Sequence, residues 1–200
     1  MLKDSRMRIS VRSTSNKEQN EVLDRVNEVT RLQPQLINVC RDNCSFSDSS
    51  PCSRDCDKAP AMLSSDGDEY PLDIKIAPLV FELKRMGFYT PCWSCEGHLG
   101  PDGKVWKLPR VWFYTTSDVY VRLLNDAIQC FAFSQILNAL WEIKLVAIAD
   151  ASFDTMYSLE PAAQNEEHNL LKLQDDISLL SLNLFRLVTS RAYELNEKLR

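Results

Sequence analysis

The sequence contains no run of 18 apolar residues, and its first residues lack the apolar core of a secretory signal. These absences predict neither a membrane span nor secretion, and we expect a cytoplasmic protein. An excess of basic residues is also missing, since the net charge is −5. The chain as a whole is therefore not steered to DNA or RNA, and nucleic-acid binding would need a local basic patch.

The length of 200 residues and an apolar content of 44% suit one domain with appendages. Composition shifts along the chain predict five segments. These are a disordered tail over 1–17, with a transit peptide as the alternative; a helix and cysteine-rich module over 18–60; a linker over 61–71; an α+β domain over 72–161; and a C-terminal helix over 162–200.

Hydrophobic periodicity gives the expected elements of this α+β fold. Helices are predicted over 18–32, from Ala77 to Met86, from Ser117 or Asp118 to Leu140, and over 165–198. Strands are predicted over 88–90, 111–115, 141–149 and 155–159, the last two as a hairpin. Together they predict a small, mostly antiparallel sheet of about four strands, packed by helices.

The C-terminal helix carries apolar residues at alternating steps of three and four, a coiled-coil spacing. The stripe comprises Leu170, Leu173, Ile177, Leu180, Leu184 and Leu187, and it stops at Arg191. A stripe this short is compatible with packing onto the domain, with self-association and with a protein partner. His168, just before it, is expected to be solvated.

Seven cysteines are many for a chain expected in a reducing compartment, and they favour metal or redox chemistry over a disulfide framework. Four of them form two pairs with three residues inside each pair: Cys40, Cys44, Cys52 and Cys56. Four thiolates within reach of one ion match a structural zinc site. An iron–sulfur cluster, two disulfides and four unrelated buried thiols remain alternatives. Cys130, alone in an apolar helix, is expected to be a core residue.

The central motif runs from Gly87 to His98 and places Cys92, Cys95 and His98 at spacings of three. Two thiols and an imidazole are three zinc ligands, and an open fourth position is typical of a catalytic or exchangeable site. Two other chemistries use the same residues. Cys92 and Cys95 could form a redox pair, and Cys95 could be a nucleophile with His98 as its base and Glu96 nearby. The plainest alternative is two core cysteines and a histidine bonded to backbone.

The region from Leu83 to Tyr114 resembles a family of uncharacterised bacterial and phage proteins with a Ser-Cys-x-Gly-His core, here Ser94 to His98. It is more distantly similar to the wybutosine-synthesis tRNA methyltransferase family, which has an arginine where this chain has His98. The resemblance implies an α+β domain with the motif on a loop between two strands. It also implies a possible enzyme acting on a nucleobase or small molecule through Ser94, Cys95, Glu96 and His98.

Bases and aromatics alternate just after the motif, at Lys104, Trp106, Lys107, Arg110 and Trp112. Such a surface can stack bases and hold phosphates, although a half-buried hairpin with outward cations explains the pattern equally simply.

Three functional hypotheses follow. The first is a zinc-binding protein with a structural or regulatory role that contacts partners through its helices. The second is the methyltransferase-like enzyme, and the third is a thiol redox sensor that uses Cys92 and Cys95. The metal ligands expected under the first hypothesis are Cys40, Cys44, Cys52, Cys56, Cys92, Cys95 and His98.

Overall fold

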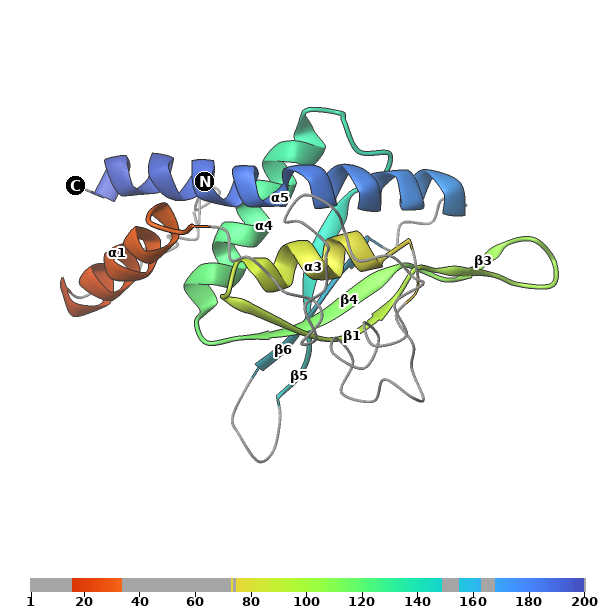
Figure 1. Ribbon diagram of the computed structural model, residues 1–200, viewed down its shortest axis with the longest axis horizontal. Coiled ribbons are helices and arrows are strands. Elements are labelled where there is room, and N and C mark those ends of the chain that lie inside the picture. Colours follow the sequence, from red (N-terminus) through yellow and green to blue (C-terminus); the bar gives the residue numbers. More distant parts are fainter. Residues whose placement is uncertain (1–15, 34–72, 74, 149–154, 163–167, 200) are drawn as a thin grey trace, which may run out of the picture.

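The computed structural model describes residues 16–33, 73, 75–148, 155–162 and 168–199. The predicted α+β class is confirmed (Figure 1). The helices are α1 (Asn16–Thr30), α3 (Ala77–Arg85), α4 (Asp118–Phe133) and α5 (Leu170–Leu199). The strands are β1 (Tyr89–Cys95), β2 (His98–Leu99), β3 (Val105–Lys107), β4 (Arg110–Thr115), β5 (Trp141–Ile148) and β6 (Thr155–Pro161).

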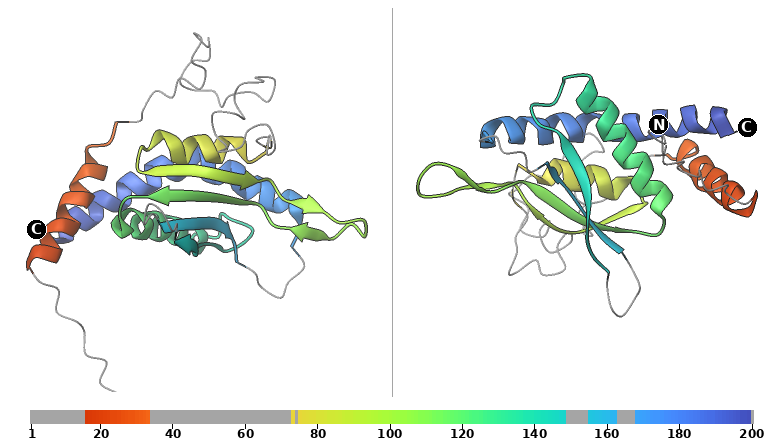
Figure 2. Two further views of the ribbon diagram at one scale, coloured as in Figure 1. Left: turned by 90° about the horizontal axis from the view of Figure 1, so that it is seen from below. Right: turned by 180° about the vertical axis from the view of Figure 1, so that it is seen from behind.

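Four strands form an antiparallel sheet in the order β1-β4-β6-β5, and β2 and β3 form a separate antiparallel pair. The predicted hairpin of β5 and β6 is present. Strands β2 and β3 continue the ladder of β1 and β4: Cys95 pairs with Arg110, and three residues further along each strand His98 pairs with Lys107. This extension stands out beyond the body of the sheet in every view (Figures 1 and 2).

The helices α3, α4 and α5 cover one side of the sheet (Figures 1 and 2). Side chains alternate between the two faces of a strand, so every second residue of β4 points at these helices. Val111 and Phe113 are fully buried, and Leu159 of β6 is buried beside them. Residues of α1 and α5 join the same core, with Val26 and Val29 from α1. All four helices of the described residues therefore contribute to one hydrophobic core.

Three helix boundaries follow the expected local chemistry. Pro78 lies in the first turn of α3, where its missing N–H costs no hydrogen bond. Gly87 follows the helix with a φ of 76°, and its N–H donates to the carbonyl of Lys84 at 3.1 Å. At the start of α4 the hydroxyl of Ser117 accepts a hydrogen bond from the N–H of Val119 at 3.3 Å.

The end of α4 differs from the prediction, which extended the helix to Leu140. The helix ends at Phe133, and Gln135 adopts a φ of 56°, a left-handed conformation that no helix continues through. Cys130 was expected in the core but is exposed. It lies off the apolar stripe of α4, which passes through Tyr120, Leu123, Leu124, Ala127, Ile128 and Phe131.

The long C-terminal helix is confirmed, and its stripe packs back onto α1, α3 and α4. The buried positions are Leu173, Asp176, Ile177, Leu180, Leu184, Val188, Ala192 and Asn196. The stripe therefore continues past Arg191, because Val188 replaces Leu187 at the point where a straight helix drifts from a seven-residue repeat. The helix begins at Leu170, and His168 before it is half-buried, not solvated as expected, with its Nε2 atom buried.

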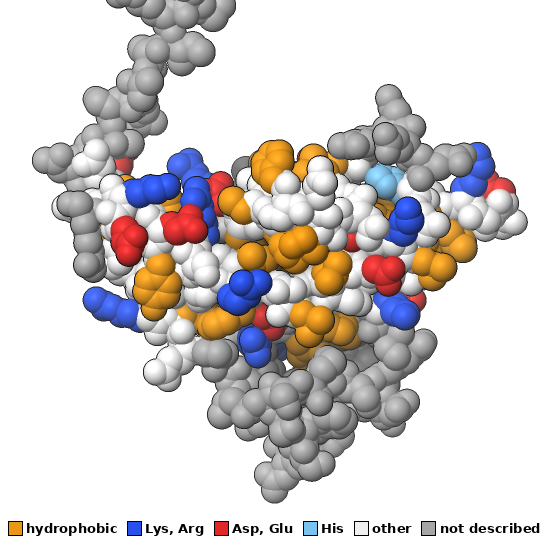
Figure 3. Space-filling view, turned by 90° about the horizontal axis from the view of Figure 1, so that it is seen from above, with side chains coloured by type: hydrophobic (Ala, Val, Ile, Leu, Met, Phe, Trp, Pro, Cys, Tyr) orange, Lys and Arg blue, Asp and Glu red, His pale blue; other side chains and the backbone are white. Residues whose placement is uncertain are grey.

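The outward face of α5 keeps two leucines in solvent, Leu171 and Leu182. Figure 3 shows this side of the molecule, where hydrophobic side chains lie among lysine, arginine and acidic ones. The step of eleven residues from Leu171 to Leu182 spans about 16 Å of helix. Protein binding through α5 stays a prediction, and this outward face is the part of the helix available for it.

Candidate metal centre

Three potential ligands come together where β1 ends. Cys95 is the last residue of β1, His98 is the first of β2, and Asp73 lies just ahead of α3. One ligand atom from each side chain lies within 4.8 Å of the other two. The cysteine is buried, the aspartate half-buried and the histidine exposed. The cluster is thus anchored in the protein on one side and reachable from solvent on the other.

Two hydrogen bonds fasten Asp73 and Lys75, ahead of α3, to the turn between β1 and β2. The N–H of Glu96 donates to Asp73 Oδ2 at 3.0 Å, and the N–H of Lys75 donates to Glu96 Oε2 at 2.8 Å. The side chain of Gln174 in α5 reaches the carbonyl of Glu96 at 3.4 Å. Such bonds orient ligands before an ion arrives. Glu96, expected beside a nucleophile, instead holds the backbone ahead of α3.

Gly97 makes the turn between the two strand ligands possible. Its φ is +86°, a conformation that side chains disfavour. A Cβ atom placed there would lie 2.7 Å from Leu170 Cδ1 and 3.1 Å from the carbonyl oxygen of Lys107. The N–H of Gly97 donates to Cys95 Sγ at 3.4 Å. The glycine therefore brings α5 and β3 close to the cluster.

The electrostatic surroundings of Cys95 favour the neutral thiol when no ion is bound. Burial raises the pKa of this thiol, and the charge of Asp73 raises it further. The N–H of Gly97 and the charges of Lys107 and Arg110 act in the opposite direction but do not outweigh the burial. A nucleophilic cysteine needs a lowered pKa, which these surroundings do not supply. A bound metal ion supplies it directly, because a coordinated thiol is deprotonated.

Cys92 does not join the cluster. It lies at a bulge of β1 between Pro91 and Trp93, where its sulfur is 3.4 Å from the carbonyl oxygen of Trp112 and 3.7 Å from Met156 Sδ. Burial raises the pKa of the Cys92 thiol to about 11. Both cysteines belong to β1, not to a loop as the sequence suggested, because the strand continues well past Thr90.

The extended conformation of β1 bears on the redox hypothesis. Three residues of extended strand separate two Cα atoms by about 10 Å, whereas a disulfide needs about 4.4–6.8 Å. A bond between Cys92 and Cys95 would thus require the strand to rearrange. Ser94, between them, pairs with Val111, and its side chain lies on the opposite face from that of Cys95. Ser94 and Cys95, which the enzyme hypothesis places in one site, therefore have side chains on opposite faces of β1.

The five residues of the suggested nucleic-acid surface are also divided. Trp106 is 68% exposed on β3, and its ring centroid lies 6.5 Å from that of His98. Trp112 packs at 4.6 Å against Trp93, and Lys107 Nζ lies 5.0 Å from the Trp93 ring. Lys104 is exposed on the connection between β2 and β3. Nucleic-acid binding at this surface stays a prediction.

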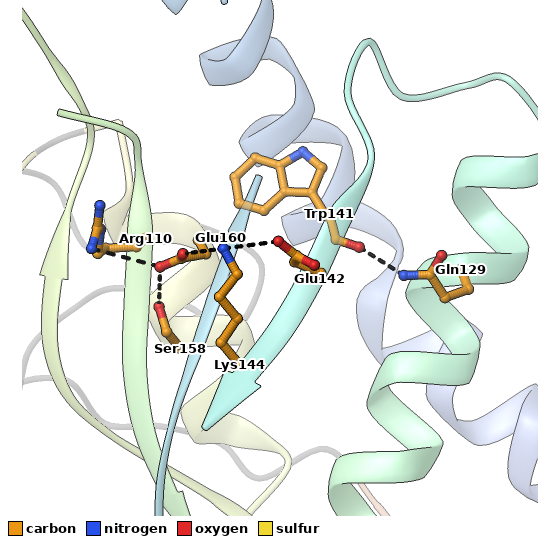
Figure 4. Close-up of polar contacts among 7 residues, drawn as sticks. All are labelled: Arg110, Gln129, Trp141, Glu142, Lys144, Ser158 and Glu160. Carbon is orange, nitrogen blue, oxygen red and sulfur yellow. Dashed lines mark hydrogen bonds and ion pairs between the residues drawn. The ribbon is translucent and has the colours of Figure 1, made fainter. Parts of the chain in front are cut away.

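Arg110 belongs to a polar network that crosses the sheet (Figure 4). At its centre is Glu160, which is 8% exposed and accepts hydrogen bonds from Ser158 Oγ at 2.7 Å and Lys144 Nζ at 2.9 Å. Arg110 Nη1 lies 3.7 Å from the same carboxylate, and Lys144 also pairs with Glu142. Burial raises the pKa of Glu160, but these hydrogen bonds and nearby cations outweigh burial and lower it overall.

The donor set of the cluster suits a single zinc ion. Zinc accepts imidazole nitrogen, thiolate sulfur and carboxylate oxygen at about 2.0–2.3 Å, which places tetrahedral ligands about 3.5 Å apart. The ligand atoms here lie within 4.8 Å of one another, so they would have to approach by about 1 Å to reach that spacing. An iron–sulfur cluster needs more thiolates than these three residues supply. Asp73 had no spacing signal in the sequence.

The remaining predicted ligands, Cys40, Cys44, Cys52 and Cys56, lie outside the described residues. Within the described part of the chain, no helix is both long and apolar enough to cross a bilayer. Comparisons with protein-family models, with curated proteins and with solved structures give no match. The geometry and donor chemistry at the end of β1 are therefore the basis for the function.

Proposed function

We propose that this protein binds a zinc ion through Asp73, Cys95 and His98, and that the ion has a structural or regulatory role. The observation that carries the proposal is the convergence of three different ligand types to within 4.8 Å from two separate parts of the chain. Asp73 and the β1–β2 turn are also held by hydrogen bonds that orient ligands without occupying all their lone pairs.

The position of Asp73 suggests what the ion does. This residue lies ahead of α3, whereas the other two ligands lie at the end of β1 and the start of β2. An ion shared among them joins the approach to α3 to the sheet, and its binding free energy adds to folding stability. At a free zinc concentration 100 times the dissociation constant, the gain is about 2.7 kcal/mol. With three protein ligands and an exposed histidine, the ion stays exchangeable.

The direct test is the zinc content of the purified full chain and its variants. Asp73→Asn, Cys95→Ser and His98→Ala should each lose one equivalent of zinc relative to the wild-type protein. The comparison uses a difference because the four cysteines between 40 and 56 could bind a second ion. Cys130→Ser, which changes an exposed cysteine of α4, is the matched control and should retain all zinc. Full zinc content in Cys95→Ser would refute the proposal.

An enzyme with Cys95 as nucleophile is the second candidate, and the observation in its favour is the imidazole of His98 within 4.8 Å of the thiol. The two candidates give different results in His98→Ala. A metal site predicts the loss of one equivalent of zinc, because one of its three ligands is gone. A catalytic pair predicts unchanged zinc and slower alkylation, because the base is gone. Unchanged zinc with unchanged alkylation would contradict both.

A further inference from the structure

Each metal ligand on the β1–β2 side of the cluster faces a cation across the ladder. Cys95 pairs with Arg110, and His98 pairs with Lys107. Directly paired residues on one face have Cβ atoms about 4.5–5.5 Å apart. Both cations act electrostatically on the thiol of Cys95. The hairpin therefore surrounds a site for a dication with two positive charges.

This charge arrangement is unfavourable for zinc alone. Zinc with the Asp73 carboxylate, the Cys95 thiolate and a neutral His98 has no net charge, and Lys107 and Arg110 then leave the site positive. Two further carboxylates lie nearby: Glu160 is 3.7 Å from Arg110 but is shared with Lys144, and Glu96 is directed to the N–H of Lys75. An anion that binds the ion would lie between like charges and relieve their repulsion.

Arg110 has donors available for such an anion. Its ion pair with Glu160 is long, at 3.7 Å, and that carboxylate is already bound by Ser158 and Lys144. Arg110 Nε is buried and has no hydrogen-bond partner among the described residues. A buried donor without a partner is costly, and a guanidinium binds carboxylate or phosphate through two parallel hydrogen bonds.

We propose that the fourth position of the zinc site takes an anionic ligand, a carboxylate or a phosphate, which Arg110 and Lys107 hold from the β3–β4 side of the ladder. This inference rests on the proposed zinc site and names the class of ligand that completes it. The ion binds one oxygen of the anion, and the guanidinium binds the remaining oxygen of a carboxylate or the remaining oxygens of a phosphate. Binding of ion and anion is then mutually reinforcing, since thermodynamic coupling between two sites is reciprocal.

The experiment titrates the full chain with Co²⁺, whose visible absorption reports four-coordinate binding in place of zinc. The signal followed is the part that Cys95→Ser removes, which separates this site from other cysteines. Titrations are run alone, with acetate, with methyl phosphate, and with acetamide as the neutral analogue of acetate. The acetate and phosphate arms distinguish the two ligand classes.

We expect at least one anion to tighten Co²⁺ binding about fivefold or more, and acetamide to leave it unchanged. Arg110→Gln should abolish the enhancement while Co²⁺ still binds, and Arg110→Lys should retain part of it. Arg186→Gln on the exposed face of α5 is the matched control and should behave as wild type. If neither anion changes the affinity for Co²⁺, or if Arg110→Gln shows the full enhancement, the proposed anionic ligand is wrong but the zinc site stands. Absence of Cys95-dependent Co²⁺ binding in every arm overturns the zinc site as well.

Discussion

Replacing Gly97 by alanine tests how tightly the turn beside the metal ligands is built. The residue has a φ of +86°, which costs a side chain about 1–2 kcal/mol. The new methyl group would also lie 2.7 Å from Leu170 Cδ1, 3.0 Å from Pro109 Cδ and 3.1 Å from the carbonyl oxygen of Lys107. Insertion of a methyl group into a packed site costs about 1–3 kcal/mol more. The expected total loss of stability is about 2–5 kcal/mol, less the 0.4–1 kcal/mol by which alanine restricts the unfolded chain.

Gly103→Ala is a matched control that separates the two costs. Gly103 has a φ of +76°, close to that of Gly97, but nothing lies within 4 Å of its Cβ position. In this variant the free energy of unfolding falls only because of the backbone conformation, by about 1–2 kcal/mol. The 0.4–1 kcal/mol by which alanine restricts the unfolded chain is subtracted from that loss. The difference between the two variants therefore measures the clash at Gly97.

The assay is urea unfolding followed by tryptophan fluorescence, with the slope on denaturant checked for constancy. Gly97→Ala should be less stable than Gly103→Ala by about 1–3 kcal/mol. A second substitution, Leu170→Ala, removes the nearest atom and should recover part of that difference, whereas the backbone contact with Lys107 remains. Equal stability of the two alanine variants would show that α5 does not press against this turn, and the described packing would be wrong.

Three further predictions concern buried residues. Leu180→Glu should reduce the free energy of unfolding by about 4 kcal/mol or more, because Leu180 is fully buried, whereas Leu182→Glu at 80% exposure should change it little. Asp176→Ala should reduce the free energy of unfolding by about 3–5 kcal/mol, because it leaves the N–H groups of Asn138, Ala139 and Trp141 without their acceptor. The control is Asp175→Ala at the neighbouring exposed position, and a similar loss in both variants would contradict the prediction. The pKa of Glu160 is lowered in the folded state, so its ionised carboxylate contributes fully to folding stability above the ordinary pKa of 4.5, and this contribution is lost as pH falls through the folded pKa. In Glu160→Gln, the free energy of unfolding, measured by denaturant titration at several pH values, should therefore fall less in acid than in the wild type. An unchanged pH profile would refute this.

The elements whose packing follows a local pattern were predictable. The helix after Ala77 and the stripe of α5 follow from apolar spacing, and the hairpin of β5 and β6 follows from two strands with a short connection. The class of the fold depends on these elements and was correct. The end of α4 was not predictable, because the chain leaves the helix to place the backbone of Asn138 on Asp176, far away in the sequence.

The candidate site was only half visible in the sequence. Cys95 and His98 were identified from their spacing, but Asp73 becomes their neighbour only because α3 packs against β1. Cys92 was grouped with them because linear spacing ignores how far an extended strand separates its residues. The bulge at Cys92 and the extended backbone after it direct the two thiols to different neighbours. The ligands come from the end of β1, the start of β2 and the segment ahead of α3, so only the tertiary structure shows that they belong together.

The helix α5 follows every other described element in the chain, yet it packs against α1, α3 and α4. During synthesis, the surfaces of α3 and α4 that pack against α5 therefore stay exposed until α5 has left the ribosome. Only then can α1, made much earlier, pack against α5 as well as against α4. Folding of the helical layer is thus deferred until α5 has been synthesised, and the apolar surface exposed before that point is prone to aggregation.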